Sequence, residues 1–145
     1  MLEEVERQWA LGYKNVCMMA TTGAGKTPTL GAIIKRHIGP SCAIAHRSNL
    51  VAQLSLTLAR EGIVHRVIAA EKTLRSIAAK HAKEFGRVYL DPSARCAVAS
   101  AQTLVKRDMA AWFHSVTMWV IDEAHHLTVG SAVSYTHLTL PTILR

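Results

Sequence analysis

The sequence lacks the features that mark secreted, membrane and disordered proteins. Its 145 residues hold only three cysteines, Cys17, Cys42 and Cys96, without a C-x-x-C pair, which argues against a disulfide framework and a zinc site. No apolar run approaches the roughly 18 residues that a membrane helix needs, and the start of the chain is acidic, unlike a signal peptide. No repeat and no Gly/Ser-rich or Pro-rich linker is present. We therefore expect reduced thiols, no membrane partner and a cytoplasmic location.

Acidic residues are also in the minority. The chain has 10 Asp and Glu against 17 Lys and Arg, a formal net charge of +7, while half of the residues are hydrophobic. A positive charge suits a polyanionic partner, but these basic residues are scattered, and many basic domains bind no nucleic acid. Length and composition together predict one compact domain with a core of its own.

Short apolar runs alternate with stretches of helical spacing along the chain. The runs are continuous rather than alternating, as in strands that are buried on both faces of a parallel sheet. The expected strands are Asn15–Ala20, Cys42–Ala45, Val64–Ala69, Cys96–Ser100 and Val116–Ile121. The expected helices are Thr27–His37, Ser48–Glu61, Lys72–Phe85 and Thr103–Phe113. This alternation predicts a doubly wound, mainly parallel α/β sheet with helices on both faces.

The stretch Lys72–Phe85 combines an apolar stripe with a lysine-rich face. The stripe contains Leu74, Ile77, Ala78, His81 and Phe85. We interpret His81 as a packed core histidine rather than a ligand. Phosphate contacts by the lysines are conceivable, but we favour a solvated charged face.

A phosphate-binding loop is predicted between the first strand and the first helix. Its candidate nucleotide-binding residues are Thr22, Gly23, Ala24, Gly25, Lys26 and Thr27. The glycines permit a tight turn whose N–H groups face a phosphate, and the helix that follows directs its positive end there. Lys26 would neutralise the β- and γ-phosphates, and the Thr27 hydroxyl would bind Mg²⁺. Ala20 stands where the general pattern has glycine, and Pro28 is tolerated because the first helical turn has unpaired N–H groups.

Two carboxylates follow the last predicted strand. Asp122 and Glu123 would lie at the carboxyl end of a parallel strand, where open α/β sheets bind ligands. Asp122 would hold Mg²⁺, and Glu123 would polarise the attacking water. Together with the phosphate loop, this pair indicates hydrolysis of a nucleoside triphosphate. The spacing of His114, His125 and His126 does not fit a zinc site.

Four segments in this order resemble those of superfamily 2 helicases and translocases. Ala20–Thr27 resembles motif I, Ala45–Gln53 motif Ia, Ala99–Leu104 motif Ib, and Asp122–His125 the DEAH form of motif II. The resemblance covers Gly12 to about Leu127. It implies a RecA-like P-loop NTPase domain, ATP with Mg²⁺, and a coupling role for His125.

The resemblance also implies a nucleic-acid partner. In the family, motifs Ia and Ib grip the sugar-phosphate backbone, which implies contacts by Arg47, Ser100, Gln102 and Thr103 and no base readout. For Arg47, a plain surface charge is the alternative. The patterns Ala-His-Arg at 45–47 and Asp-Glu-Ala-His-His at 122–126 favour DNA over RNA. Preference for adenine is implied by the family only, because no glutamine motif surrounds Gln8.

The resemblance implies an incomplete motor. The second RecA-like domain, which closes over ATP in the family, has no counterpart in this sequence. Residues 1–130 are therefore interpreted as the truncated helicase ATP-binding domain of a DNA helicase or translocase, inactive by itself. A restriction-enzyme motor subunit and a catalytically inactive nucleotide-binding fragment are the alternatives.

The last residues do not resemble the rest of the domain. Residues 131–145 resemble the translation of a sequencing-library adapter, and we expect a non-native, poorly ordered tail there. A native Thr-rich strand is the alternative.

Overall fold

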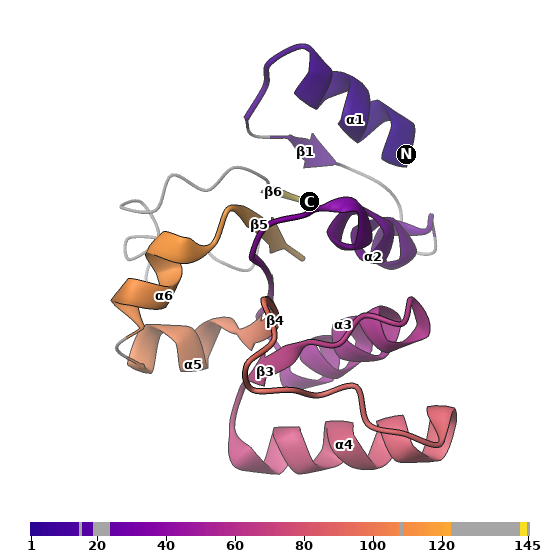
Figure 1. Ribbon diagram of the computed structural model, residues 1–145, viewed down its shortest axis with the longest axis vertical. Coiled ribbons are helices and arrows are strands. Elements are labelled where there is room, and N and C mark those ends of the chain that lie inside the picture. The colour runs from indigo at the N-terminus through magenta and orange to yellow at the C-terminus, as the bar shows by residue number, and fades with distance from the viewer. Residues whose placement is uncertain (15, 19–23, 108, 123–142, 145) are drawn as a thin grey trace.

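Strands alternate with helices along the chain (Figure 1), and the computed structural model describes residues 1–14, 16–18, 24–107, 109–122 and 143–144. The elements are α1 (Leu2–Ala10), β1 (Cys17–Met18), α2 (Lys26–Arg36), β2 (Ser41–Ala45), α3 (Ser48–Arg60), β3 (Arg66–Ile68), α4 (Glu71–Phe85), β4 (Cys96–Ser100), α5 (Ala101–Lys106), α6 (Ala110–Ser115), β5 (Met118–Ile121) and β6 (Ile143–Leu144).

The main sheet has four parallel strands in the order β3-β4-β2-β5. In the centre, β2 pairs with β4 along its whole length, so that Ala45 and Ser100 are partners at the carboxyl ends. A second, two-stranded sheet pairs β1 with β6 in parallel, and β6 also contacts β5. The predicted mainly parallel α/β architecture is confirmed.

The main sheet is covered on both faces. Ala43, Val98 and Val120 belong to one hydrophobic cluster with buried residues of α2, α3 and α4. Their strand neighbours Ile44 and Trp119 belong to a second cluster, which α5 and α6 complete. Because successive strand residues point to opposite faces and both faces are covered, the strands read as continuous apolar runs.

Two predicted details of the helices have clear outcomes. The single helix Thr103–Phe113 is wrong, because the chain leaves α5 at Arg107 in an extended conformation and begins a second helix, α6. This turn lets Trp112 and Phe113 pack on Trp119, with ring centroids 6.1 and 5.5 Å apart. The interpretation of His81 as a core residue is confirmed by its complete burial.

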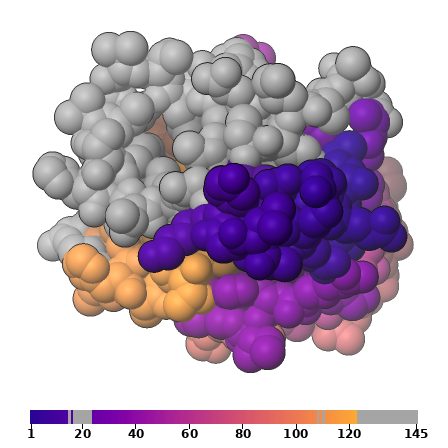
Figure 2. Space-filling model, turned by 90° about the horizontal axis from the view of Figure 1, so that it is seen from above, coloured from indigo at the N-terminus to yellow at the C-terminus, as the bar shows by residue number. Residues whose placement is uncertain are grey.

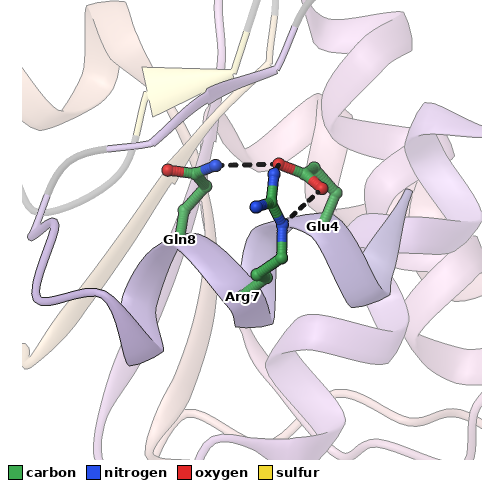
Figure 3. A network of polar contacts seen from close by, with 3 residues as sticks. All are labelled: Glu4, Arg7 and Gln8. Atoms are coloured by element: carbon green, nitrogen blue, oxygen red, sulfur yellow. Dashed lines mark hydrogen bonds and ion pairs between the residues drawn. The ribbon is translucent and has the colours of Figure 1, made fainter.

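Helix α1 is not among the predicted elements, although Leu2, Val5 and Trp9 have helical spacing and pack against the first cluster. It lies on the surface beside the purple residues that include α2 (Figure 2), and Glu6 forms an ion pair with Arg36. On its outer side, Glu4 accepts hydrogen bonds from Arg7 and from Gln8, the latter 2.8 Å long (Figure 3). Among the described residues, no helix has the length and apolar character needed to cross a membrane.

Candidate nucleotide site and nucleic-acid surface

The described part of the predicted phosphate loop ends in a tight turn. Gly25 is the residue before α2 and has the left-handed backbone conformation, with φ 82° and ψ 23°. Residues with a side chain rarely adopt this conformation, which favours glycine here. The reason is the backbone conformation and not a lack of space, because no atom lies within 4 Å of the position that a Cβ would take. Ala24, just before it, is exposed. Thr22 and Gly23 lie outside the described residues.

Lys26 and Thr27 are the first two residues of α2. N–H groups in a first helical turn have no acceptor within the helix, so this turn is suited to binding an anion. Pro28 takes the third position without losing a helical hydrogen bond, as expected. Thr29 fixes the turn, because its backbone N–H and its hydroxyl both donate to the carbonyl of Gly25, at 3.1 and 2.8 Å.

Asp122 follows β5 directly. Its backbone N–H donates to the carbonyl of Ile44 over 2.9 Å, which continues the pairing of β5 with β2 by one residue. The Asp122 side chain is half-buried at this carboxyl edge. The contact with Ile44 could not be found from the sequence, because it depends on strand register. Glu123 and His125 lie outside the described residues.

The strand before the phosphate loop and the strand before Asp122 are joined through β6. Ile143–Leu144 pairs with β1 and contacts β5, and the ribbon shows β1, β6 and β5 in neighbouring positions (Figure 1). The segment before Lys26 and the segment before Asp122 therefore belong to one body of the fold. Of the predicted tail, residues 131–145, the structure describes only Ile143 and Leu144.

The residues assigned to nucleic-acid contact follow two paired strands. Arg47 is exposed between β2 and α3, and Gln102 is exposed in the first turn of α5, after β4. Ala45 and Ser100 are strand partners, so the segment after β2 and the segment after β4 begin next to each other at the carboxyl edge of the sheet. Thr103 is half-buried, whereas Ser100 is only 8% exposed, which leaves Gln102 the most accessible of the three.

Nearly the whole chain matches a known protein family. A family model described as "Type III restriction enzyme, res subunit" matches residues 1–141. No curated protein matches the sequence.

Solved structures share the fold. The UvsW helicase from bacteriophage T4 superposes with a TM-score of 0.62 at 18% identity, covering 91% of this chain and 46% of the other. A second structure of T4 UvsW gives a TM-score of 0.61 at 19% identity, covering 88% of this chain and 26% of the other. The chain thus spans less than half of the length of these proteins.

Proposed function

The chain belongs to the family described as the res subunit of type III restriction enzymes, and we propose that it is the ATP-binding and hydrolysing motor domain of a superfamily 2 DNA helicase or translocase. In a complete protein, this domain would couple ATP hydrolysis to movement along nucleic acid.

The observation that carries the proposal is the turn from the phosphate loop into α2. A left-handed glycine followed by Lys26 and Thr27 at a helix start combines N–H groups of a first helical turn, a flexible cation and a hydroxyl at one point. This combination is suited to a chain of phosphates. Asp122 directly follows β5, and its backbone N–H is bonded to the carbonyl of Ile44 in β2. It adds a carboxylate of the kind that triphosphate hydrolysis requires.

Each residue has a defined task in this proposal. The N–H groups from Thr22 to Thr27 cradle the phosphates, and Lys26 neutralises the β- and γ-phosphates. Glu123 orients and polarises the attacking water, and His125 links this site to the nucleic-acid surface.

Magnesium fits the oxygen donors of the site. Thr27 and Asp122 supply a hydroxyl and a carboxylate, the hard oxygen ligands that Mg²⁺ prefers. When bound, the ion neutralises charge on the phosphate oxygens during transfer.

DNA is the proposed polymer. Arg47 follows β2, and Gln102 and Thr103 follow β4, which is paired with β2 in the sheet. The sugar-phosphate backbone of one nucleic-acid strand can therefore contact both segments, with Ser100 buried behind them. These are contacts to sugar and phosphate, and sequence specificity is not expected from them.

The description of the family supports a second candidate, the motor subunit of a restriction enzyme. It uses the same ATP site and differs in what the rest of the protein does. A nuclease or methyltransferase partner in the same complex would favour it over a free-standing helicase.

Nucleotide binding tests the site on the chain as it stands. We expect Lys26→Ala to weaken the binding of ATP by about tenfold or more, because a charge-assisted contact contributes about 1.5–3 kcal/mol. Isothermal titration of ATP in the presence of Mg²⁺ measures this. Lys83→Ala, on exposed α4, removes the same charge elsewhere and should bind ATP like the wild type.

Hydrolysis tests the motor. In a protein that joins this chain to a second RecA-like domain, we expect DNA to stimulate phosphate release and Lys26→Ala to abolish it. ATP binding that depends on Lys26 without any stimulated turnover would instead identify an inactive nucleotide-binding domain. Equal turnover by the wild type and Lys26→Ala would contradict the proposal.

A further inference from the structure

A pocket lies between α3 and α4. It has a volume of about 350 Å³ and is lined by Ser48, Asn49, Ala52, Lys72, Thr73, Ser76, Ile77 and Lys80. The described residues of its lining supply two lysines, three hydroxyls and an amide, and none of them is a carboxylate. Hydrogen-bond donors and positive charge without a negative group are the chemistry of an anion site.

The two lysines are turned to this pocket by helical spacing. Lys72, Ser76 and Lys80 are four residues apart on α4, so they form one row along the helix. The row faces Ser48 and Asn49 in the first turn of α3. The sequence alone favours a solvated face for these lysines. Both lysines are exposed, in agreement with that interpretation, and the packing of α4 against α3 adds an opposite wall to their face.

Both acidic residues of α4 form ion pairs with arginines, although Glu84 continues the row four residues after Lys80. Glu71 forms an ion pair with Arg75 over 3.1 Å, and Glu84 forms one with Arg60 over 2.6 Å. Within the described residues, neither Lys72 nor Lys80 forms an ion pair. The carboxylates of α4 are therefore paired with arginines and not with the two lysines of the pocket.

The position of the pocket relates it to the surface proposed for nucleic acid. Strand β3 lies next to β4 in the sheet, and α4 is the helix that follows β3 in the chain. Helix α3 follows β2 and begins directly after Arg47. The contacts between α3 and α4 follow the same order along both helices. Ser55 is hydrogen-bonded to His81, and Arg60, later in α3, forms an ion pair with Glu84, later in α4. The two helices are therefore parallel, and their first turns lie together at the carboxyl edge that also carries Arg47.

We propose that this pocket binds a backbone phosphate of the nucleic-acid strand that Arg47 contacts, with Lys72 and Lys80 as the cations and Ser76 between them. The inference rests on the proposed function and adds a second phosphate site to it. The pocket extends the contacts to the nucleic-acid backbone from the loop after β2 to α4, without contacts to bases. It lengthens the footprint of the domain on the strand.

Salt dependence of binding tests the pocket. A fluorescently labelled single-stranded oligonucleotide is titrated with the full chain at several salt concentrations, and anisotropy gives the dissociation constant. We expect the double variant Lys72→Ala/Lys80→Ala to bind at least about fivefold more weakly at low salt. The slope of log K against log salt should fall by about 0.7 for each phosphate that the variant no longer neutralises.

Two variants separate the pocket from net charge. Lys14→Ala/Lys83→Ala removes two exposed lysines outside the pocket and should keep nearly the wild-type slope. Ser76→Asp keeps both lysines but places a negative charge between them, and it should weaken binding as well. Lys72, Ser76 and Lys80 are exposed, so thermal unfolding should be unchanged in all variants.

The outcomes distinguish this inference from the proposed function. If Arg47→Ala weakens binding while both pocket variants bind like the wild type, the pocket is not a phosphate site and the proposed function stands. If the wild type binds no oligonucleotide, the nucleic-acid part of the proposed function fails, and this inference with it. Inorganic phosphate that shifts the amide resonances of Ser76 and Lys80 without any oligonucleotide binding would replace it by a small-anion site.

Discussion

At the scale of single residues, the hydroxyl of Ser55 links two buried histidines, because it accepts a hydrogen bond from His81 and donates one to His65. The backbone N–H of Tyr89 donates to Nδ1 of His81, so Nε2 of His81 carries the proton and donates to Ser55 Oγ over 3.0 Å. His65 Nδ1 donates to the carbonyl of Ile63, which leaves its Nε2 to accept from the Ser55 hydroxyl over 2.7 Å. Every polar atom of this network is satisfied with both histidines neutral.

Removing the central hydroxyl should be costly. We expect Ser55→Ala to lower the free energy of unfolding by about 1–3 kcal/mol, because it leaves an acceptor on His65 and a donor on His81 buried without a partner. Urea unfolding followed by circular dichroism measures this. Ser115→Ala, at the exposed end of α6, should change stability by less than about 0.5 kcal/mol. A Ser55→Ala protein as stable as the wild type would refute this account of the network.

Motif residues and network residues differ in how far the sequence predicts them. The tight turn at Gly25 and the helix that begins beside it could be predicted, because a phosphate loop has glycines at fixed local spacing before a helix, whereas the role of Lys26 in binding phosphate stays a prediction. His81 could be assigned to the core from its place in an apolar stripe. Its link to Ser55 and His65 could not be predicted, because the three residues come from different segments and meet only through tertiary packing.

At the scale of elements, the turn between α2 and β2 is locked against the start of β5. The Thr117 hydroxyl donates to the carbonyl of Pro40 over 3.0 Å and lies 2.8 Å from Nε2 of His37. Gly39 stands between these contacts. A Cβ at Gly39 would lie 2.3 Å from Thr117 Oγ1 and 3.0 Å from His37 Nε2.

A methyl group at this junction should therefore destabilise the sheet. We expect Gly39→Ala to lower the free energy of unfolding by about 1–3 kcal/mol, because Thr117 must move from its hydrogen bonds. Denaturant unfolding of the single variants and of Gly39→Ala/Thr117→Ala forms a double-mutant cycle. Thr117→Ala removes the clashing oxygen, so the double variant should lose less than the sum of the single losses. Simple additivity would show that the clash does not determine the cost.

The strands and long helices could be predicted, because burial on both faces gives continuous apolar runs and amphipathic helices repeat every 3.6 residues. The division into α5 and α6 could not, since it depends on the packing of Trp112 and Phe113 on Trp119. The sequence contains a signal for α1 in the spacing of Leu2, Val5 and Trp9, although the predicted elements do not include this helix. The interpretation of residues 131–145 as a non-native tail stays a prediction.

At the scale of the whole molecule, the order of the strands arranges the motifs. The carboxyl ends of the strands follow each other across the sheet in the order β3, β4, β2 and β5. These strands precede α4, the segment that resembles motif Ib, the segment that resembles motif Ia, and Asp122. Segments that are far apart in the sequence thus form one surface, with the proposed polymer contacts beside the proposed metal ligand. Motif order in the sequence predicts that these segments belong together, but their order in space depends on the strand crossovers.

The buried histidines should also make the stability of the whole domain depend on pH. Burial lowers the pKa of His65 from 6.5 to about 4, and burial lowers the pKa of His81 in the same direction, against a smaller opposite effect of Glu84. The unfolded chain therefore binds more protons than the folded one in this range, so stability rises with pH. The contribution is complete above about pH 6.5 and is lost as pH falls towards 4. For His65 it amounts to about 3 kcal/mol at most.

Urea unfolding at pH 7.5, 6 and 5 measures this loss, which we expect as a falling midpoint below pH 6.5. His65→Gln is the matched variant, because an amide can still form hydrogen bonds but cannot take up a proton. It should be less stable than the wild type at pH 7.5 and have a flatter pH profile. The profile of Ile77→Val, which loses only a buried methyl group on α4, should fall in parallel with that of the wild type. If His65→Gln follows the wild-type profile, other groups are responsible for the acid sensitivity.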